Sequence, residues 1–482
     1  MHLIKLLAII LKRSRPMKQS FSQLKPQITE LKQQIQGSIL FSSDSQVKKY
    51  WNMAVRTATC LIVRVKNVQD IIKVLNFARR HRLPLAVRSG WHNSYVGYYT
   101  ENQSVLIDLS DVNHIDVNVQ LRNAHLGPGN TWGDVSDALQ PYKLAIPSGD
   151  AASVGVGGLT QGSGIGFLSR KYGLTIDALR SIEMVTADGE VCRASRKENP
   201  ELFWGVRGGA GNFGIITDFE FDLFEVEEVL GGTLYYKGIK AEDLLKIVNL
   251  AYEAPDELTV IIDMMAAHPV PFLPAKYHFQ PVISVSFCYA GDLETGKNVI
   301  APFRKIGNII SDQVTQQPYK NLLTNLPEDL TFGSYGRNMY METFDEQKAK
   351  TFVEVVNKNL SSNISIQLRV LGGAISRVPE NHTAFAHRNK PYLVHISNVF
   401  TSMEEADRYY TCMENVWDKL KPYAAGADVN FIEIGDTDRL EEFYSEEILH
   451  RLISLKKHYD LENIFRNNLN LKPDITNYPW KD

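Results

Sequence analysis

The sequence is poor in cysteine. Only four are present, they are widely separated, and no two form a CxxC pair: Cys60, Cys192, Cys288 and Cys412. Zinc ribbons and the disulfide frameworks of small secreted proteins both need closely spaced or paired cysteines. The sequence therefore excludes a zinc ribbon and argues against a disulfide framework. We expect the four thiols to be small buried apolar side chains.

An excess of charge of one sign is also absent. The 52 Lys and Arg side chains against 55 Asp and Glu side chains leave a formal net charge of −3. Proteins that bind nucleic acids or anionic membranes usually carry a basic excess. We therefore predict that neither a nucleic acid nor a membrane is a partner of this chain.

Long hydrophobic runs are missing as well. The apolar stretch Leu3–Leu11 is interrupted by Lys5 and is too short to span a bilayer. A basic cluster at residues 12–15 follows this stretch, whereas a secretion signal carries its basic residues in front and ends in a small-residue cleavage site. We expect a cytoplasmic protein whose translation starts at Met1 or at Met17.

Several motifs of catalysis and nucleotide binding are absent too. The chain contains no GxxxxGK[ST] or HExxH motif and no GxSxG motif with triad partners. Residues Gly209–Gly214 match GxGxxG, but a dinucleotide fingerprint follows a strand and opens a helix. Here the motif precedes the predicted strand Ile215–Phe224 instead. We therefore exclude an ordinary nicotinamide-binding domain.

The chain is long enough for two or three domains, with 482 residues. Residues 50 to 225 alternate short strands, glycine-rich loops and short helices, among them the predicted helix Val68–Arg80 and the predicted strand Val105–Leu109. Apolar residues recur at helical spacing in the first of these segments. The mixture favours an α+β domain over regularly repeating βαβ units.

Residues 230 to 425 have a different character. Longer alternating strands, such as Val282–Tyr289 and Ile364–Leu371, occur among amphipathic helices, which predicts an antiparallel sheet covered by helices on one face. A charged helix at Arg439–Tyr459 and a polar tail complete the chain. The predicted divisions are an N-terminal extension with a helix (1–36), a first domain (37–226), a second domain (227–427) and a C-terminal segment (428–482).

Two loops carry the candidate binding residues. Glycines and small residues are dense from Pro147 to Gly166, which fits a backbone that wraps closely around a phosphate-bearing ligand. A flexible loop is the alternative, but the sequence 169–173 that follows has no disorder-like composition. The second loop, Arg88–Asn93, places His92 beside a glycine. Taken alone, a loop histidine is more often an ordinary polar residue.

Together with further motifs, these loops resemble the vanillyl-alcohol-oxidase-type flavoproteins, and among them the berberine-bridge-enzyme-like FAD oxidases. The resemblance spans residues ~37 to 473. It implies a PCMH-type FAD-binding domain in two parts, an inserted α+β substrate domain with an antiparallel sheet, and a C-terminal segment that returns to the flavin. The matching motifs, in chain order, are 88–92 (RSGWH), 127–133 (GPGNTWG), 154–158 (VGVGG), 168–175 (LSRKYGLT), 201–214 and 459–470.

The resemblance implies that His92 forms a covalent bond to the flavin ring. Relatives with a second link have a cysteine at the position of Ala151, so we expect His92 to be the only anchor. Trp91 replaces a glycine of the family loop, which leaves a non-covalent flavin as an alternative. The FAD-binding residues implied by the resemblance are Arg88, Ser89, Gly90, Trp91, His92, Asn93, Ser148, Gly149, Ser153, Val154, Gly157, Gly158, Gly164, Ile216, Asn468 and Asn470.

The catalytic base departs from the family pattern. Asp428 stands where many relatives have the tyrosine of a Tyr-x-Asn motif, and a buried carboxylate with a raised pKa is a possible base. A solvated loop aspartate is the alternative. Tyr340 is a second candidate that faces either the pocket or the core.

The resemblance implies an FAD-dependent oxidoreductase that takes a hydride from a small-molecule alcohol, sugar or amine. The small side chain of Val154 favours O2 as the electron acceptor, as in an oxidase. Two alternatives stay open at this point. One is a flavin-retaining binding protein that has lost catalysis, and the other is a reductase of the same fold that uses a nicotinamide donor.

Overall fold

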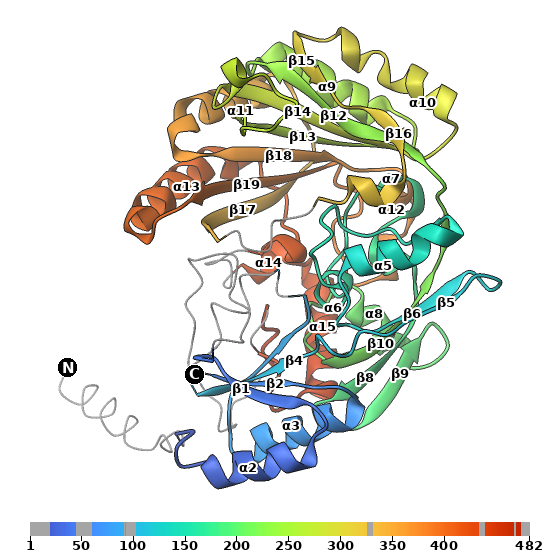
Figure 1. Ribbon diagram of the computed structural model, residues 1–482, viewed down its shortest axis with the longest axis vertical. Helices are drawn as coiled ribbons and strands as arrows, with labels where there is room; N and C mark the ends of the chain where they lie inside the picture. The colour runs from blue at the N-terminus through green and yellow to red at the C-terminus, as the bar shows by residue number, and fades with distance from the viewer. Residues whose placement is uncertain are drawn as a thin grey trace.

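The chain folds into two lobes, which Figure 1 shows one above the other. The computed structural model describes residues 20–44, 60–90, 92, 103–324, 331–432, 439–466 and 469–473. The lower lobe contains two sheets with the N-terminal helices, and the upper lobe contains one larger sheet with helices against it. Helices and strands are mixed, as the α+β prediction requires.

The first sheet of the lower lobe has four strands in the order β1-β2-β4-β3. Strands β2, β4 and β3 are parallel, and β1 is antiparallel to β2. Helix α3 spans Val68–Arg80 as predicted, because Asn67 caps its first turn and Ile71, Val74 and Leu75 are buried against the sheet. The other elements are α2 (Lys25–Gln34), β1 (Ser38–Phe41), β2 (Cys60–Arg64), β3 (Leu85–Arg88) and β4 (Ser104–Asp108).

The second sheet of the lower lobe has five antiparallel strands in the order β5-β6-β10-β8-β9. The alternation predicted for residues 215–224 appears in β10 (Gly214–Asp222), whose Phe219 and Phe221 are fully buried. Gly209–Gly214 lies between a helix and β10, which confirms that it is not a dinucleotide fingerprint. The other elements are β5 (Ile115–Asn118), β6 (Asn123–Leu126), α5 (Trp132–Leu139), β7 (Leu144–Ala145), α6 (Val156–Thr160), α7 (Ser169–Tyr172), β8 (Leu179–Thr186), β9 (Val191–Ser195), α8 (Pro200–Val206) and β11 (Phe224–Glu225).

The upper lobe is built on an eight-stranded antiparallel sheet in the order β15-β12-β14-β13-β18-β19-β17, with β16 beside β12. Apolar side chains from alternate strand positions form one large core with the helices on one face, which confirms the predicted architecture. The elements are β12 (Val229–Lys237), α9 (Ala241–Glu253), β13 (Leu258–Ala266), β14 (Pro281–Tyr289), α10 (Leu293–Ile300), β15 (Ile309–Asp312), β16 (Thr315–Gln317), β17 (Gly333–Met341), α11 (Glu346–Asn359), β18 (Ser365–Val370), α12 (Ala374–Arg377), β19 (Tyr392–Phe400) and α13 (Ala406–Leu420).

The two lobes are joined by buried polar contacts as well as by the chain itself. Arg388 pairs with Asp177 at 2.7 Å, and both side chains are almost fully buried. Arg170 donates from Nη2 to the carbonyl oxygen of Ala254 at 2.7 Å. All strands of the large sheet come from residues 229–400, inside the segment 227–427 predicted as the second domain. The domain boundaries themselves stay a prediction.

The C-terminal segment returns to the lower lobe. The single helix predicted at Arg439–Tyr459 is wrong, because the structure contains two helices, α14 (Leu440–Phe443) and α15 (Glu446–Tyr459). The break occurs at Tyr444, which has extended backbone angles, and Ser445 then caps the second helix. Beyond α15, Phe465 forms a parallel β-bridge with Leu85 at the start of β3.

A fully buried ion pair fixes this return. Lys456 donates to the Asp460 carboxylate at 2.7 Å and to the carbonyl oxygens of Phe465 at 2.7 Å and Asn212 at 3.0 Å. Asp460 in turn accepts hydrogen bonds from the backbone N–H groups of Ile464 and Phe465. The pair therefore joins the last helix to the loop before β10 and to the segment that enters the site.

We searched the described part of the chain for a transmembrane helix. No helix in it combines the length and the apolar composition that crossing a membrane requires.

The buried ion pair leads to a stability prediction. Replacing Lys456 by Met leaves Asp460 buried without a cation, which costs about 3–5 kcal/mol of unfolding free energy. The matched control is Lys358→Met, because Lys358 pairs with Glu354 at the same i,i+4 spacing but on the surface. We expect that control to cost at most about 0.5 kcal/mol. Urea midpoints of the two variants measure the difference, and equal midpoints would contradict the prediction.

Candidate active site

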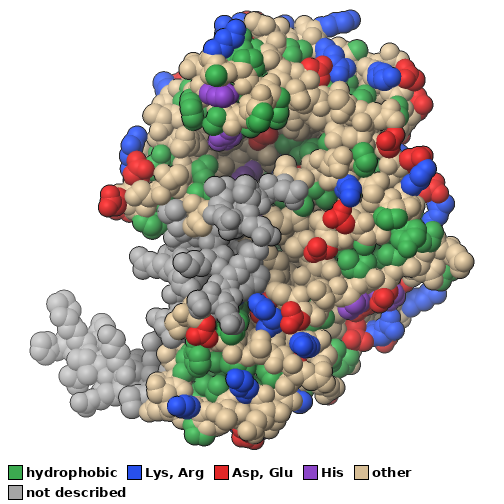
Figure 2. Space-filling view, in the orientation of Figure 1, with side chains coloured by type: hydrophobic (Ala, Val, Ile, Leu, Met, Phe, Trp, Pro, Cys, Tyr) green, Lys and Arg blue, Asp and Glu red, His purple; other side chains and the backbone are tan. Residues whose placement is uncertain are grey.

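A cavity of about 540 Å³ lies between the two lobes, and a hollow opens between them on the face drawn in Figure 2. Its size falls within the range of sites for small organic ligands and cofactors. Loop segments within 85–92, 149–165 and 210–216 form most of the lower wall. Strands β17 and β19, with residues 429–432, form the opposite wall.

Two loops of the lower lobe touch through bare backbone at the cavity. A Cβ built on Gly90 would lie 2.4 Å from the Cα of Gly155, and one built on Gly155 would lie 2.4 Å from the nitrogen of Gly90. No side chain fits at either position. At Gly158, by contrast, a Cβ would meet nothing within 4 Å, because this glycine borders the open cavity. The loops thus form a cradle in which a bound group approaches the backbone directly.

Backbone hydrogen bonds hold the glycine-rich loop in place. The N–H groups of Trp132 and Gly133, at the start of α5, donate to the carbonyl oxygens of Val154 and Ala152, both at 2.9 Å. The N–H of Val156 donates to the carbonyl of Asn130 at 2.9 Å. The cradle is therefore positioned by the five-stranded sheet and its helix before any ligand enters.

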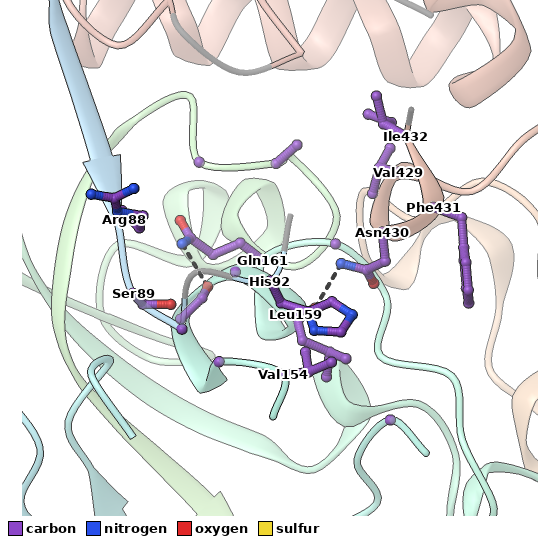
Figure 3. Close-up of a pocket in the computed structure, with 18 of the residues that line it drawn as sticks. Arg88, Ser89, His92, Val154, Leu159, Gln161, Val429, Asn430, Phe431 and Ile432 are labelled. Carbon is purple, nitrogen blue, oxygen red and sulfur yellow. Dashed lines mark hydrogen bonds between the residues drawn. The ribbon is translucent and has the colours of Figure 1, made fainter. Parts of the chain in front are cut away.

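His92 points into this cavity, next to Val154 and Leu159 in the view of Figure 3. Its Nδ1 lies 3.4 Å from the hydroxyl of Ser153. Burial lowers the pKa of His92, although the nearby Asp150 carboxylate acts in the opposite direction. The neutral form of the imidazole therefore prevails at neutral pH.

Most residues predicted to bind the cofactor line the cavity. They are Arg88, Ser89, Gly90, His92, Gly149, Val154, Gly157, Gly158 and Ile216. Four others lie outside its lining: Ser148, Ser153, Gly164 and Asn470. The remaining three, Trp91, Asn93 and Asn468, lie outside the described residues.

Two of the residues outside the lining have structural contacts, and a third lacks a hydrogen-bond donor. The Ser148 hydroxyl donates to the carbonyl of Gly149 at 3.0 Å. Gly164 packs so closely on Thr175 that a Cβ would lie 2.0 Å from the threonine hydroxyl. Asn470 differs, since its buried Oδ1 accepts no hydrogen bond from any residue that the structure describes. A buried amide oxygen of this kind needs a donor, and a bound ligand can supply one.

The two predicted catalytic residues do not line the cavity. Asp428 is 1% exposed and Tyr340 is 0% exposed, so Asp428 is not a solvated loop residue and Tyr340 belongs to the core. The Tyr340 hydroxyl donates to Asp428 Oδ2 at 2.6 Å, and the Ser163 hydroxyl donates to the same oxygen at 2.8 Å. Burial raises the pKa of Asp428 and, with the facing carboxylate, raises the pKa of Tyr340 well above its usual value.

This buried pair lies directly behind a residue that does line the cavity. Asn430 donates its backbone N–H to Asp428 Oδ1 at 2.7 Å. Its side-chain oxygen accepts from the backbone N–H groups of Ser163 and Gly164, and its amide donates to the Leu159 carbonyl at 3.2 Å, as Figure 3 shows. Sequence reasoning missed Asn430 as a site residue, although it is the asparagine of the Tyr-x-Asn motif in which Asp428 replaces the tyrosine.

His387 packs against the same pair. Its ring centroid lies 4.7 Å from that of Tyr340, and its Nε2 lies 3.1 Å from the carbonyl oxygen of Glu442. Burial lowers the pKa of His387 to about 4. The folded protein therefore holds this imidazole neutral well below the pH at which an exposed histidine becomes charged.

The wall contributed by the upper sheet carries polar side chains. His395, Ser397 and Ser334 of β19 and β17 line the cavity, opposite the cradle. The His395 ring lies 5.3 Å from the ring of Phe431, which borders the cavity beside Asn430. His395 was also missed, and its signal is the alternation in β19, where its apolar neighbours Val394 and Ile396 enter the helix-covered core.

Comparisons with known proteins agree on the segments that frame this cavity. A family model described as an FAD binding domain matches residues 60–195, and one described as berberine and berberine like matches residues 427–472. An FAD-linked oxidoreductase from Dictyostelium discoideum is 30% identical, over 92% of this chain and 97% of its own length.

Solved structures share the architecture. The chain is similar to 6-hydroxy-D-nicotine oxidase from Arthrobacter nicotinovorans, with a TM-score of 0.81 and 25% identity over 91% of this chain and 98% of the other. It is also similar to xylooligosaccharide oxidase from Myceliophthora thermophila, solved with xylobiose, with a TM-score of 0.81 and 20% identity over 93% and 100% of the two chains. The second likeness concerns the fold alone.

The low pKa of His387 predicts how stability depends on pH. Below about pH 6.5 the unfolded chain protonates this histidine, whereas the folded chain does so only near pH 4. Stability therefore falls as the pH drops through this window, by up to about 3 kcal/mol from this residue. We expect His387→Gln to lose correspondingly less stability between pH 7 and pH 4.

Urea unfolding of both proteins at a series of pH values measures this difference. His268→Gln is the control, because His268 is exposed, and its pH dependence should match that of the wild type. Parallel curves for the wild type and His387→Gln would contradict the prediction.

Proposed function

Because the chain belongs to the berberine-bridge-like FAD-linked oxidoreductases, as the resemblance in its motifs predicted, we propose that it is an oxidase of a small molecule. The observation that carries the proposal is the cavity itself, with a glycine cradle on one wall and polar side chains of a sheet on the other. The glycine cradle suits the cofactor, and the polar wall suits a substrate that lies against that cofactor.

The residues present fit FAD. Gly90 and Gly155 allow the two loops to touch, and Gly158 leaves the backbone beside them open to a bound group. The buried amide oxygen of Asn470 needs a donor that no described residue supplies. When bound, FAD would accept a hydride from the substrate and pass the electrons to O2, with peroxide as the product. Val154 lines the cavity, and its small side chain supports access for O2.

His92 is our proposed covalent anchor for the flavin. In support, it lines the cavity within reach of Ser153, and burial lowers the pKa of its imidazole, so the neutral, nucleophilic form prevails at neutral pH. Ala151 also lines the cavity and has no thiol to form a second link. We therefore propose a single bond to the cofactor.

We propose that His395 accepts the substrate proton and that Asp428 and Tyr340 position Asn430. The cavity is lined by His395 but not by the other two, and a base must reach its proton through a hydrogen bond. The carboxylate of Asp428 is occupied by donors from Tyr340, Ser163 and the backbone of Asn430. These contacts hold the loop 159–164 and the cavity wall together.

The anchor is tested by precipitating the purified yellow protein with acid. We expect flavin to remain in the pellet of the wild type, on the peptide that contains His92, and to move entirely to the supernatant in His92→Ala. Ser153→Ala is the control, because it removes the contact with His92 without removing the nucleophile. Flavin in the wild-type supernatant would overturn the covalent link while leaving FAD binding intact.

The base is tested by stopped-flow measurement of flavin reduction without oxygen, using any alcohol, sugar or amine that yields peroxide with the wild type. We expect His395→Gln to slow reduction about 10²–10⁴-fold, since it keeps the polar contact but loses the proton acceptor. FAD content should be unchanged. Reduction at the wild-type rate would rule out His395, and the absence of peroxide with every substrate would favour a flavin-binding protein without catalysis.

A further inference from the structure

Beyond His395, and outside the residues that line the cavity, the same face of the sheet carries a row of polar side chains. Register pairs Asp263 of β13 with Gln367 of β18, and Gln367 with His395 of β19. Their neighbours Ile262, Leu368 and Val394 all enter the core under the helices, so the row faces the other way, toward the lower lobe. With strands ~5 Å apart, Asp263 lies about 10 Å from His395 across the sheet.

Asp263 is a carboxyl group with a vacant oxygen. Its Oδ1 accepts a hydrogen bond from Gln367 Nε2 at 3.0 Å, whereas Oδ2 accepts none from any described residue. The residue is only partly covered. Burial nevertheless raises the pKa of Asp263 to about 6, with Gln367 and Arg369 opposing that shift. The group is therefore mostly ionised at pH 7. Removing a carboxylate from water without giving it a partner costs free energy.

Arg369, the cation that acts on Asp263, already has other partners. Arg369 donates from Nη2 to Asp150 at 2.8 Å and from Nε to Gln367 Oε1 at 2.9 Å. Its guanidinium also lies over the ring of Phe431 at 5.1 Å. The ion pair of Arg369 is thus with Asp150, and Asp263 is affected by the guanidinium only through the longer-range attraction that opposes the rise of its pKa. Gln367 connects the two charged groups and orients Asp263.

We propose that this wall recognises a protonated amino group, which binds Asp263 while the remainder of the substrate extends over Gln367 toward His395. The substrate class is then a primary or secondary amine rather than a neutral sugar or a carboxylic acid. This assignment rests on the proposed function for the identity of the pocket. An ammonium group would donate a hydrogen bond to the second oxygen of Asp263 and would also carry the opposite charge. Such a charge-assisted hydrogen bond is stronger than one from a neutral hydroxyl.

The interaction has a defined pH dependence. As the pH falls below about 6, Asp263 gains a proton and loses its attraction for a cation. The groups on its side of the sheet and opposite it are Tyr235 on β12, Ser284 on β14, Gln367 and Arg369 on β18, His395 on β19 and Asp150 on the opposite loop. His395→Gln is included in the test because it removes the imidazole of the cavity wall and leaves Asp263 in place.

The test measures equilibrium binding to the purified FAD-loaded protein by calorimetry. The probes are benzylammonium and 4-phenylbutylammonium, their alcohol counterparts, and benzoate. At pH 7.5 we expect the ammonium compounds to bind about 30-fold more tightly than the alcohols, a preference that Asp263→Asn abolishes while alcohol binding changes less than about threefold. Asp407→Asn, an exposed residue of α13, removes the same charge elsewhere and should keep the preference.

Below pH 6 the ammonium affinity should fall about tenfold per pH unit in the wild type and in His395→Gln, and the alcohol affinity should stay constant. The inference is overturned if the ammonium compounds do not bind, if they bind no better than the alcohols, if Asp263→Asn keeps the preference, or if benzoate binds most tightly. Binding requires no turnover. If the protein prefers the ammonium compounds but releases no peroxide, the inference stands and the oxidase proposal fails.

Discussion

The contact between Gly90 and Gly155 is the constraint on which the site depends. It joins the loop after β3, in the mixed sheet, to the loop before α6, which the antiparallel sheet positions. Because the two backbones meet with no room for a Cβ, the part of the cavity floor at this crossing consists of peptide groups rather than side chains. His92 follows the first glycine, and Gly157 and Gly158 follow the second. A shift at this crossing would therefore displace the proposed anchor and the cradle together.

The opposite wall is determined by a simpler rule: side chains along a strand alternate between its two faces. In β19, Val394 and Ile396 enter the core under the helices, which leaves His395 and Ser397 on the cavity side. The same helices that stabilise the upper lobe thereby determine which side chains face the substrate. Polar residues are tolerated on this face because the lobes do not close completely over it. The two walls are thus specified by different parts of the chain and by different physical rules.

Sequence patterns predicted this fold well where a local rule decides it. Helix α3 follows from residues within one or two turns, and the alternation of β10 can be read from the sequence of that strand alone. The break at Tyr444 was missed, since the charged pattern of 439–459 continues across it. Of the site, the glycine loops were recognisable, but Asp263 and His395 were not. They are 132 positions apart in the sequence, and only the pairing of β13, β18 and β19 brings them to one row.

Position 428, where aspartate replaces the family tyrosine, shows how contacts between distant residues change the interpretation of a sequence motif. An aspartate in the place of a family tyrosine suggested a new base, yet the structure places a hydroxyl group directly beside that aspartate. Tyr340 supplies it from β17, on the far side of the carboxylate, and the pair holds Asn430 from behind. A buried carboxylate that already accepts three hydrogen bonds is a poor acceptor for a further proton. A packed layer also separates it from a substrate in the cavity. This arrangement is the reason for our proposal that the proton is accepted by a group that borders the cavity, and among these groups His395 lies opposite the cradle.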